Sequence, residues 1–282
     1  MSGSALGLDV VNQGQVFDFF QKEKPEYVFL SSPRSGGIQA NIQFAAEFSY
    51  YNLMGQCNII HAAFSNEAKK LLYYGSSCVY PKESPQPIQE KDWMSGPLEE
   101  TSEPYAIAKM AGIKMCQAYR TQYGFNAIVM IPATIYGPGC EINLQMAHVL
   151  ESLVGKFAMA KAKDEKEVVV WGTGQPRREF LYVGDFTKAS EFLMDHYNEK
   201  DMINAGCGSD ISIKELAEMI AGVADYQGQI IFDDTKPDGA PKKLLDNSRI
   251  RQLGWEPRQD LREGIEKTFE WYKDLFTSER EK

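Results

Sequence analysis

The sequence predicts an α/β protein built on a parallel β-sheet with helices on both faces. Short runs that are apolar throughout, such as "YVFLSS" (27–32), alternate with longer stretches of helical spacing. Strands that are apolar on both sides are typical of parallel sheets, because helices cover both faces of such sheets. From about residue 139 the pattern becomes mixed, which indicates a smaller α/β lobe interleaved with the first.

The elements of the first lobe follow in order after the strand at 27–32. Residues 41–64 have the spacing of one long helix, and residues 70–77 read as a second buried strand that enters a serine-rich turn. A second helix is predicted at 105–124, where Gly124 would close it, because glycine readily adopts the left-handed backbone of a helix C-terminus. Residues 126–139 read as a third strand running into a Gly/Pro loop.

The second lobe is predicted from shorter strand-like runs and amphipathic stretches. Its strands are expected at 168–171, 178–183 and 229–233, and helices of the remaining chain near 144–160, 185–198, 212–224 and 260–276.

Composition excludes several classes of function. The net charge is −9, and no Lys/Arg-rich block stands out, which argues against a nucleic acid or an anionic membrane as partner. No apolar run approaches the length needed to span a bilayer, and the N-terminus lacks the pattern of a secretory signal. Five scattered cysteines without a CxxC, and only three histidines, predict reduced thiols in a cytoplasmic compartment and no metal site.

The segment "YAIAK" is the first candidate for chemistry. Tyr105 and Lys109 are four residues apart on the predicted helix, so both side chains project from one face. A nearby ammonium favours the phenolate form of tyrosine and lowers its pKa. The strand end "GSSCVY" lies shortly before it and offers the hydroxyl of Ser76 to a carbonyl. Such a set can pass a proton to a carbonyl while a nicotinamide supplies hydride.

These residues carry a family resemblance that runs over most of the chain. The segments "SSCVYPK", "EPYAIAK" and "WGTGQPRREF" resemble the extended short-chain dehydrogenases/reductases of the NAD-dependent epimerase/dehydratase family, and more narrowly the GDP-L-fucose synthases. The resemblance implies a Rossmann-type doubly wound sheet with a smaller substrate lobe. It also implies NADP as cofactor, GDP-4-keto-6-deoxy-mannose as substrate, and its epimerisation and reduction to GDP-L-fucose.

The resemblance also implies roles for eight residues. Ser76, Tyr105 and Lys109 match the reductase triad, of which Tyr105 and Lys109 also contact the cofactor. Cys78 and His148 match the acid–base pair that epimerises the carbons flanking the ketone. The alternatives without a catalytic role are that Cys78 is a buried thiol and that His148 is a core or helix-capping histidine. The substrate nucleotide is expected at Trp171, Arg178 and Lys243; core packing and a surface ion pair are the alternatives for Trp171 and Arg178.

The chain departs from the family pattern at its start. The family begins with a strand, a GxxGxxG turn and a helix, which bind the cofactor pyrophosphate, and no such turn occurs in the sequence. Residues 8–20 already resemble the segment after the family's third strand. We therefore expect an N-terminally truncated sheet with 27–32 as an edge strand. The family usually has Ala-Ala where this chain has Ser31-Ser32, and the stretch 139–149 also differs.

The expected domain division and partners follow from the same resemblance. Residues 1–138 and 183–204 would form the truncated Rossmann domain, and residues 139–182 and 205–282 the substrate lobe. A homodimer is expected through helices 41–64 and 105–123. Two hypotheses stay open: an NADP-dependent epimerase/reductase, and a non-catalytic or partly active subunit without its own dinucleotide-binding turn.

Overall fold

The computed structural model describes residues 7–140, 143–144 and 146–278. Its main sheet consists of β1 (Tyr27–Leu30), β2 (Lys70–Tyr74), β3 (Ala127–Pro132) and β8 (Ile203–Ala205) in the order β1-β2-β3-β8. All neighbouring strands of this sheet are parallel. The α/β class with a parallel sheet is therefore confirmed.

The side chains of β2 alternate between the two helical layers that cover the sheet. Tyr73 points to one layer, where its hydroxyl donates to Gln56 Oε1 at 2.6 Å. Tyr74 points to the opposite layer, where its ring lies 4.8 Å from that of Phe186 between centroids. The two faces of β2 are thus both covered, which explains why the strand after Lys70 consists of leucine and tyrosine side chains.

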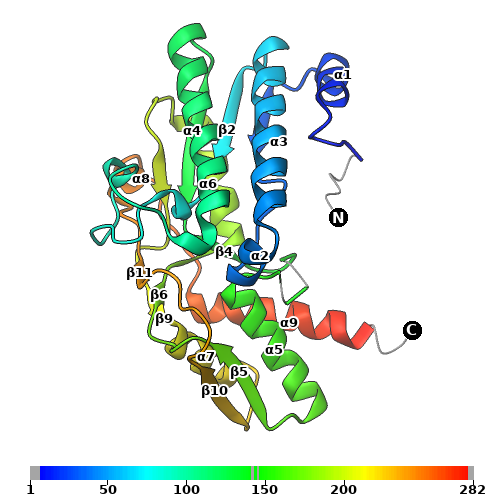
Figure 1. Cartoon of the computed structure of the whole chain (residues 1–282), viewed down its shortest axis with the longest axis vertical. Helices are drawn as coiled ribbons and strands as arrows, with labels where there is room; N and C mark the ends of the chain where they lie inside the picture. The colour runs from blue at the N-terminus through cyan, green and yellow to red at the C-terminus, as the bar shows by residue number, and fades with distance from the viewer. Residues whose placement is uncertain (1–6, 141–142, 145, 279–282) are drawn as a thin grey trace.

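The helices of the first layer are α3 (Ala45–Ser65) and α4 (Glu103–Tyr123), which lie side by side (Figure 1). α4 ends at Gly124 with φ 71°, as predicted. The helix expected at 41–64 is in fact two, because the chain bends at Phe44 between α2 (Ile38–Gln43) and α3. α1 (Gln13–Glu23) packs on α3, and α6 (Val183–His196) covers the opposite face.

The edge strand β1 corrects one expectation. Val28 and Leu30 are buried, but Tyr27 and Phe29 are 55% and 49% exposed, so the strand is not buried on both sides. The reason is its position at the end of the four-stranded sheet, where the described helices cover only one of its faces. The prediction that this strand lies at an edge is confirmed for the described residues.

The second part of the molecule, lower in Figure 1, has three small sheets. β5 (Glu167–Trp171) pairs in parallel with β10 (Gln229–Asp233), and β4 (Thr134–Tyr136) with β7 (Phe180–Tyr182). β6 (Arg177–Arg178) lies between β9 (Ile211–Ser212) and β11 (Lys242–Lys243). The helices of this part are α5 (Val149–Lys163), α7 (Ile213–Val223) and α9 (Leu261–Ser278), whereas α8 (Ser248–Gln252) packs beside β8 of the main sheet.

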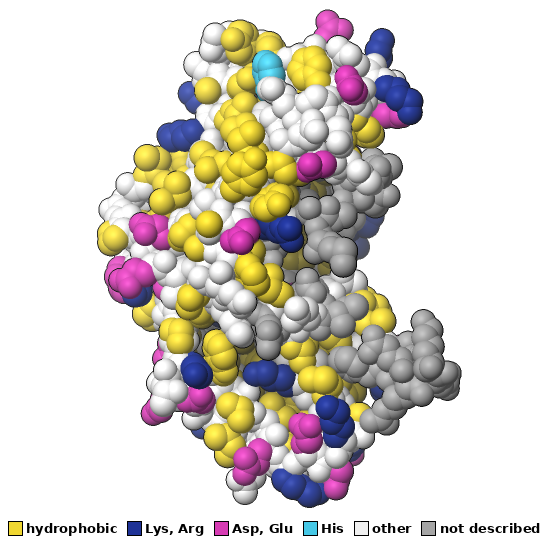
Figure 2. Space-filling view, turned by 45° about the vertical axis from the view of Figure 1, so that its right-hand side comes forward, with side chains coloured by type: hydrophobic (Ala, Val, Ile, Leu, Met, Phe, Trp, Pro, Cys, Tyr) yellow, Lys and Arg dark blue, Asp and Glu magenta, His cyan; other side chains and the backbone are white. Residues whose placement is uncertain are grey.

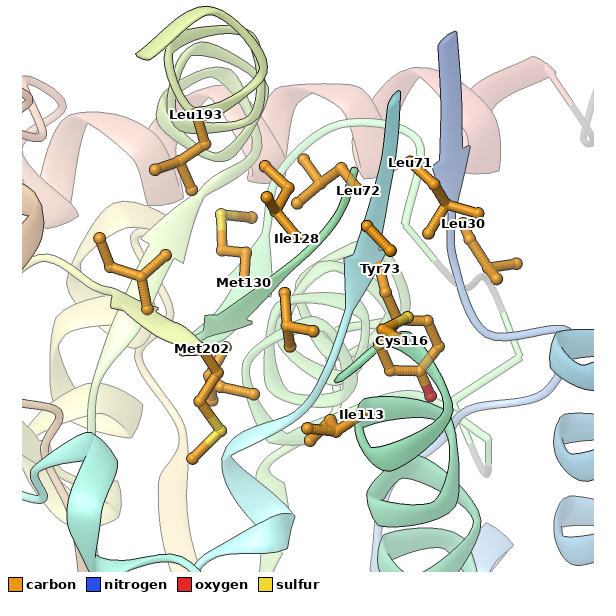
Figure 3. Close-up of a cluster of buried hydrophobic side chains, with 14 of the residues drawn as sticks. Leu30, Leu71, Leu72, Tyr73, Ile113, Cys116, Ile128, Met130, Leu193 and Met202 are labelled. Carbon is orange, nitrogen blue, oxygen red and sulfur yellow. The ribbon is translucent and has the colours of Figure 1, made fainter. Parts of the chain in front are cut away.

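Two clusters of buried side chains form separate cores. The first surrounds the main sheet and includes Leu72, Ile128 and Met130 (Figure 3). The second lies among α5, α7, α9 and their strands. Leu245 and Trp255 belong to the first core, although they fall in the predicted substrate lobe. The division of the chain into the two predicted lobes stays a prediction.

Among the described residues, no helix is both long and apolar enough to cross a bilayer. In the same residues, no cluster of three or more His, Cys, Asp or Glu side chains is placed to hold a metal ion.

The buried side chain of Lys70 ties the start of β2 to the end of α6. Its ammonium donates to the carbonyl oxygens of Leu193, Met194 and Tyr197 at 3.1, 2.6 and 2.7 Å, and to Asn198 Oδ1 at 3.0 Å. A cation at a helix C-terminus interacts favourably with the exposed carbonyl groups.

We expect Lys70→Met to lower the free energy of unfolding by about 2–4 kcal/mol, because it leaves buried carbonyl oxygens without donors. Lys69→Met is the matched control, since Lys69 is exposed and pairs only with Glu26. Urea unfolding followed by circular dichroism measures both. Equal midpoints for the two variants would contradict the account.

Candidate active site

The turn after β2 presents Ser76 and Cys78. Residues 77–79 form a single 3₁₀ turn, and Ser76 caps it: the Ser76 Oγ accepts a hydrogen bond from the Cys78 backbone N–H at 3.3 Å. Serine suits this position because its side chain can accept from the backbone two residues on. The cap orients the turn so that Ser76 and Cys78 both line one cavity.

Tyr105 reaches the same cavity from the first turn of α4. Pro104 lies at the start of this helix, where its fixed φ is tolerated. The Tyr105 hydroxyl lies 3.2 Å from Ser32 Oγ. Burial raises the pKa of the phenol to about 12, and hydrogen bonds from Ser32 and Ser76 oppose this shift. Ser32, in the loop after β1, was not assigned a role from the sequence.

Lys109 follows Tyr105 by four residues in α4, and its side chain extends to β2. Its ammonium donates to the Tyr74 carbonyl oxygen at 2.6 Å and lies 4.6 Å from the centroid of the Tyr73 ring. The side chain is buried behind the cavity wall, and burial lowers its pKa to about 7. The expected lowering of the Tyr105 pKa is not found, because burial raises this pKa and Lys109 is not among the groups that oppose the shift. The role of Lys109 in the triad stays a prediction.

His148 stands at the start of α5 and also lines the cavity. Burial lowers the pKa of its imidazole, and the positive charge of Lys243 lowers it further. The loop before it runs against Gly36 and Gly37, and Gly37 N–H donates to Met146 O at 3.0 Å. A Cβ on Gly37 would lie 2.4 Å from Ala147 O, so this close approach requires glycine.

Two short strands place the cations of the site. In the pairing of β11 with β6, Lys243 stands opposite Arg178. The Lys243 Nζ lies 3.5 Å from the Cys78 Sγ. Arg178 donates to the carbonyl oxygens of Arg177 and Asp238, and its side chain lines the cavity. Trp171 lines it from the end of β5 and is 39% exposed, which contradicts a place in the core.

The cavity has a volume of about 890 Å³ and lies between the carboxyl ends of the main sheet and the second part of the molecule. Seven of the eight sequence-predicted site residues line it, and Lys109 is the exception. The seven are Ser76, Cys78, Tyr105, His148, Trp171, Arg178 and Lys243. Residues 141–142 and 145, in the stretch that departs from the family pattern, lie outside the described residues.

Sequence reasoning missed Glu151 in the wall of this cavity. Its side chain is 4% exposed, its Oε2 has no hydrogen-bond partner among the described residues, and burial raises its pKa to about 7. The only signal in the sequence was a glutamate three residues after His148 in an otherwise apolar helix start. Glu151 therefore adds an uncompensated carboxyl group to the site.

Comparison with known proteins places this site in a family. The model of the NAD dependent epimerase/dehydratase family matches residues 4–206. The chain belongs to this family. It is 50% identical over 266 residues to "Probable GDP-L-fucose synthase 1" of Oryza sativa subsp. japonica, a match covering 94% of this chain and 81% of that protein. It is 43% identical to the GDP-L-fucose synthase of Escherichia coli K12, over 94% of this chain and 85% of that protein.

A solved member of similar fold is the GDP-mannoheptose C4 reductase of Campylobacter jejuni with NADP bound. It superimposes with a TM-score of 0.84 at 36% identity, covering 96% of this chain and 88% of that one. The Rossmann-like fold and the nucleotide-sugar chemistry of the epimerase/dehydratase family are thus shared by relatives from plants and bacteria.

Proposed function

We propose that the chain is a GDP-L-fucose synthase, which epimerises and then reduces GDP-4-keto-6-deoxy-mannose with NADPH. One observation carries the proposal: a hydroxyl pair, a thiol, an imidazole and two cations converge on a single cavity. The relatives named GDP-L-fucose synthase support the substrate, and the reductase with NADP bound supports the cofactor.

Reduction falls to Ser76 and Tyr105. When bound, NADPH supplies hydride to the carbonyl carbon. The Ser76 hydroxyl donates a hydrogen bond to the carbonyl oxygen, and the Tyr105 hydroxyl gives its proton to that oxygen as negative charge develops. The hydroxyls of Ser32 and Tyr105 and the loop after β1 fit the nicotinamide end of such a cofactor, because they stand at the carboxyl edge of the sheet.

Epimerisation falls to Cys78 and His148. A base removes the proton of the carbon next to the ketone, and the electron pair of that C–H bond moves toward the carbonyl oxygen to give an enolate. An acid on the opposite face then returns a proton to the same carbon. Cys78 and His148 come from different parts of the chain and line the same cavity, and thiol and imidazole groups can exchange protons near neutral pH.

The nucleotide of the substrate is assigned to the side of the cavity with Trp171, Arg178 and Lys243. A guanidinium and an ammonium bind diphosphate oxygens, and an indole packs against a base. Burial of the Arg178 side chain strengthens such a contact, since it removes the competing water.

Two variants test the division of labour. We expect Tyr105→Phe to slow oxidation of NADPH by about 10²–10⁴-fold, because the proton donor is lost, while exchange of solvent deuterium into the keto sugar continues. We expect Cys78→Ser to show the converse pattern, in which exchange falls and reduction of an already epimerised keto sugar is retained. Absorbance at the NADPH band and NMR measure the two steps.

Loss of both activities in each single variant would contradict the separate roles. Titration calorimetry with NADPH on the 282-residue chain tests the cofactor assignment, and absence of binding heat with and without the GDP-sugar would overturn it. The chain would then be a non-catalytic or a partly active subunit. Exchange of solvent deuterium into the keto sugar without NADPH would indicate a partly active subunit, and no exchange a non-catalytic one.

We also propose a homodimer through the outer faces of α3 and α4. Tyr50, Met54 and Cys57 form one stripe along α3, and Tyr50 and Ile107 are 56% and 51% exposed. Hydrophobic side chains gather on the upper half of the face in Figure 2. Apolar surface of this kind on two adjacent long helices favours pairing with a second copy.

Sedimentation equilibrium at micromolar concentration tests the dimer. We expect twice the mass of the chain for the wild type, and the mass of one chain for the double variant Tyr50→Glu, Met54→Glu, because two charges would be buried in the interface. Leu253→Glu, at an exposed position after α8, is the control and should leave the dimer intact. A monomeric wild type would contradict the proposal.

A further inference from the structure

The ammonium of Lys243 lies against the thiol of Cys78 inside the cavity. The distance between Nζ and Sγ is 3.5 Å. An opposite charge this close favours the ionised form of a thiol, and a thiolate is a far stronger base and nucleophile than a thiol. The resemblance to known sequences had assigned Lys243 to the nucleotide alone, so the contact with Cys78 requires its own explanation.

The backbone around Lys243 is held from three sides. Its strand pairs with β6, the Leu244 N–H donates to Gln86 Oε1 at 2.9 Å, and the Leu245 N–H donates to Glu179 Oε2 at 2.9 Å. Glu179 is itself buried and also accepts from Gly208 N–H. The fold therefore sets the backbone position of Lys243, from which its side chain reaches Cys78.

The other groups around the pair leave the ammonium available to the sulfur. Four titratable or charged groups interact with Cys78 or Lys243, namely Glu99, Tyr105, His148 and Arg178. Glu99 is the acidic competitor, but its carboxylate accepts from Thr101 N–H and Oγ1 and from Ser102 Oγ. Among the described residues, no carboxylate forms an ion pair with Lys243.

The surroundings of the sulfur also favour negative charge. Burial raises the pKa of a thiol, and at Cys140 burial and then the Glu151 carboxyl group raise it to about 11. At Cys78 the Lys243 charge and hydrogen bonds from Ser76 and Ser102 outweigh burial, and the pKa is lowered. The same Lys243 charge acts in the opposite sense on His148, which it disfavours as imidazolium.

We propose that Lys243 is a positioning residue for the epimerisation, whose ammonium holds Cys78 as the thiolate that removes the proton next to the ketone. The proposal rests on the function proposed above and deepens it. In the step, the Cys78 sulfur gains the proton and becomes a neutral thiol. The electron pair of the C–H bond passes to the enolate. His148, which must carry a second proton at this step, gives that proton to the opposite face of the carbon and becomes a neutral imidazole.

Alkylation of Cys78 by iodoacetamide between pH 5 and 10 tests the charge pair without any substrate. We expect the midpoint of its rate in the wild type to lie below that of Cys207, a partly exposed thiol in the loop after β8 that lies outside the cavity and the proposed dimer interface and serves as the internal control. Mass spectrometry of the two peptides separates the rates. In Lys243→Met we expect the Cys78 midpoint to rise by about 1–3 pH units, the effect of losing an opposite charge at this distance.

Two further variants complete the design. Lys243→Arg keeps the charge and should keep the Cys78 midpoint close to that of the wild type. Lys242→Met removes the neighbouring lysine, whose ammonium pairs with Asp210 at 2.8 Å, and should leave the midpoint unchanged. A wild-type Cys78 midpoint at or above that of Cys207 would overturn the proposal, whether or not Lys243→Met folds.

Enzyme kinetics distinguish this role of Lys243 from binding of the substrate diphosphate. If Lys243 maintains the thiolate, kcat for deuterium exchange in Lys243→Met falls at least tenfold at neutral pH and recovers as pH rises, since the thiol then ionises unaided. A rise in KM with an unchanged kcat and an unchanged alkylation midpoint would show a phosphate role alone and overturn the proposal. A shifted midpoint in a chain inactive on every GDP-keto sugar would instead refute the proposed function.

Discussion

The parallel pairing of β1, β2 and β3 is the constraint on which the site depends. Parallel strands direct their carboxyl ends to one edge, so the loops after all three strands meet there. Ser32 follows β1, Ser76 follows β2 and Ala133 follows β3, and all three line the cavity. A shift of β2 by one residue in its pairing would exchange the two faces of the strand, and Ser76 and Cys78 would no longer line the cavity.

Burial is the second determinant, because it shifts every ionisable group toward its neutral form unless a partner opposes it. Tyr105, Lys109 and Glu151 all follow this rule, with pKa values of about 12, 7 and 7. Cys78 departs from it, because the Lys243 ammonium and hydrogen bonds from Ser76 and Ser102 oppose the effect of burial on its pKa. A thiolate held beside a fixed ammonium in a cavity suits proton transfer at a carbon atom, because the base stays ionised while the substrate is bound.

Sequence reasoning succeeded where the signal is local. The long periodic elements and the Gly124 helix end were predicted, and the motif residues Ser76, Cys78 and Tyr105 line one cavity as expected. Sequence reasoning failed where contacts between distant parts of the chain determine the conformation. The bend at Phe44, the three-residue β8 and the rotation of Lys109 toward Tyr74 leave no pattern in the sequence. The Lys243–Cys78 contact joins residues far apart in the chain and depends on the β6–β11 pairing.

The central claim is that one cavity both epimerises and reduces the same sugar. The most direct test is conversion of GDP-4-keto-6-deoxy-mannose by the wild-type chain with NADPH in D₂O, with the product examined by NMR. The account predicts solvent deuterium at both carbons that flanked the ketone, and hydride from NADPH at the carbon between them. A product that carries the NADPH hydrogen but keeps protium at both flanking carbons would contradict it and indicate a reductase alone.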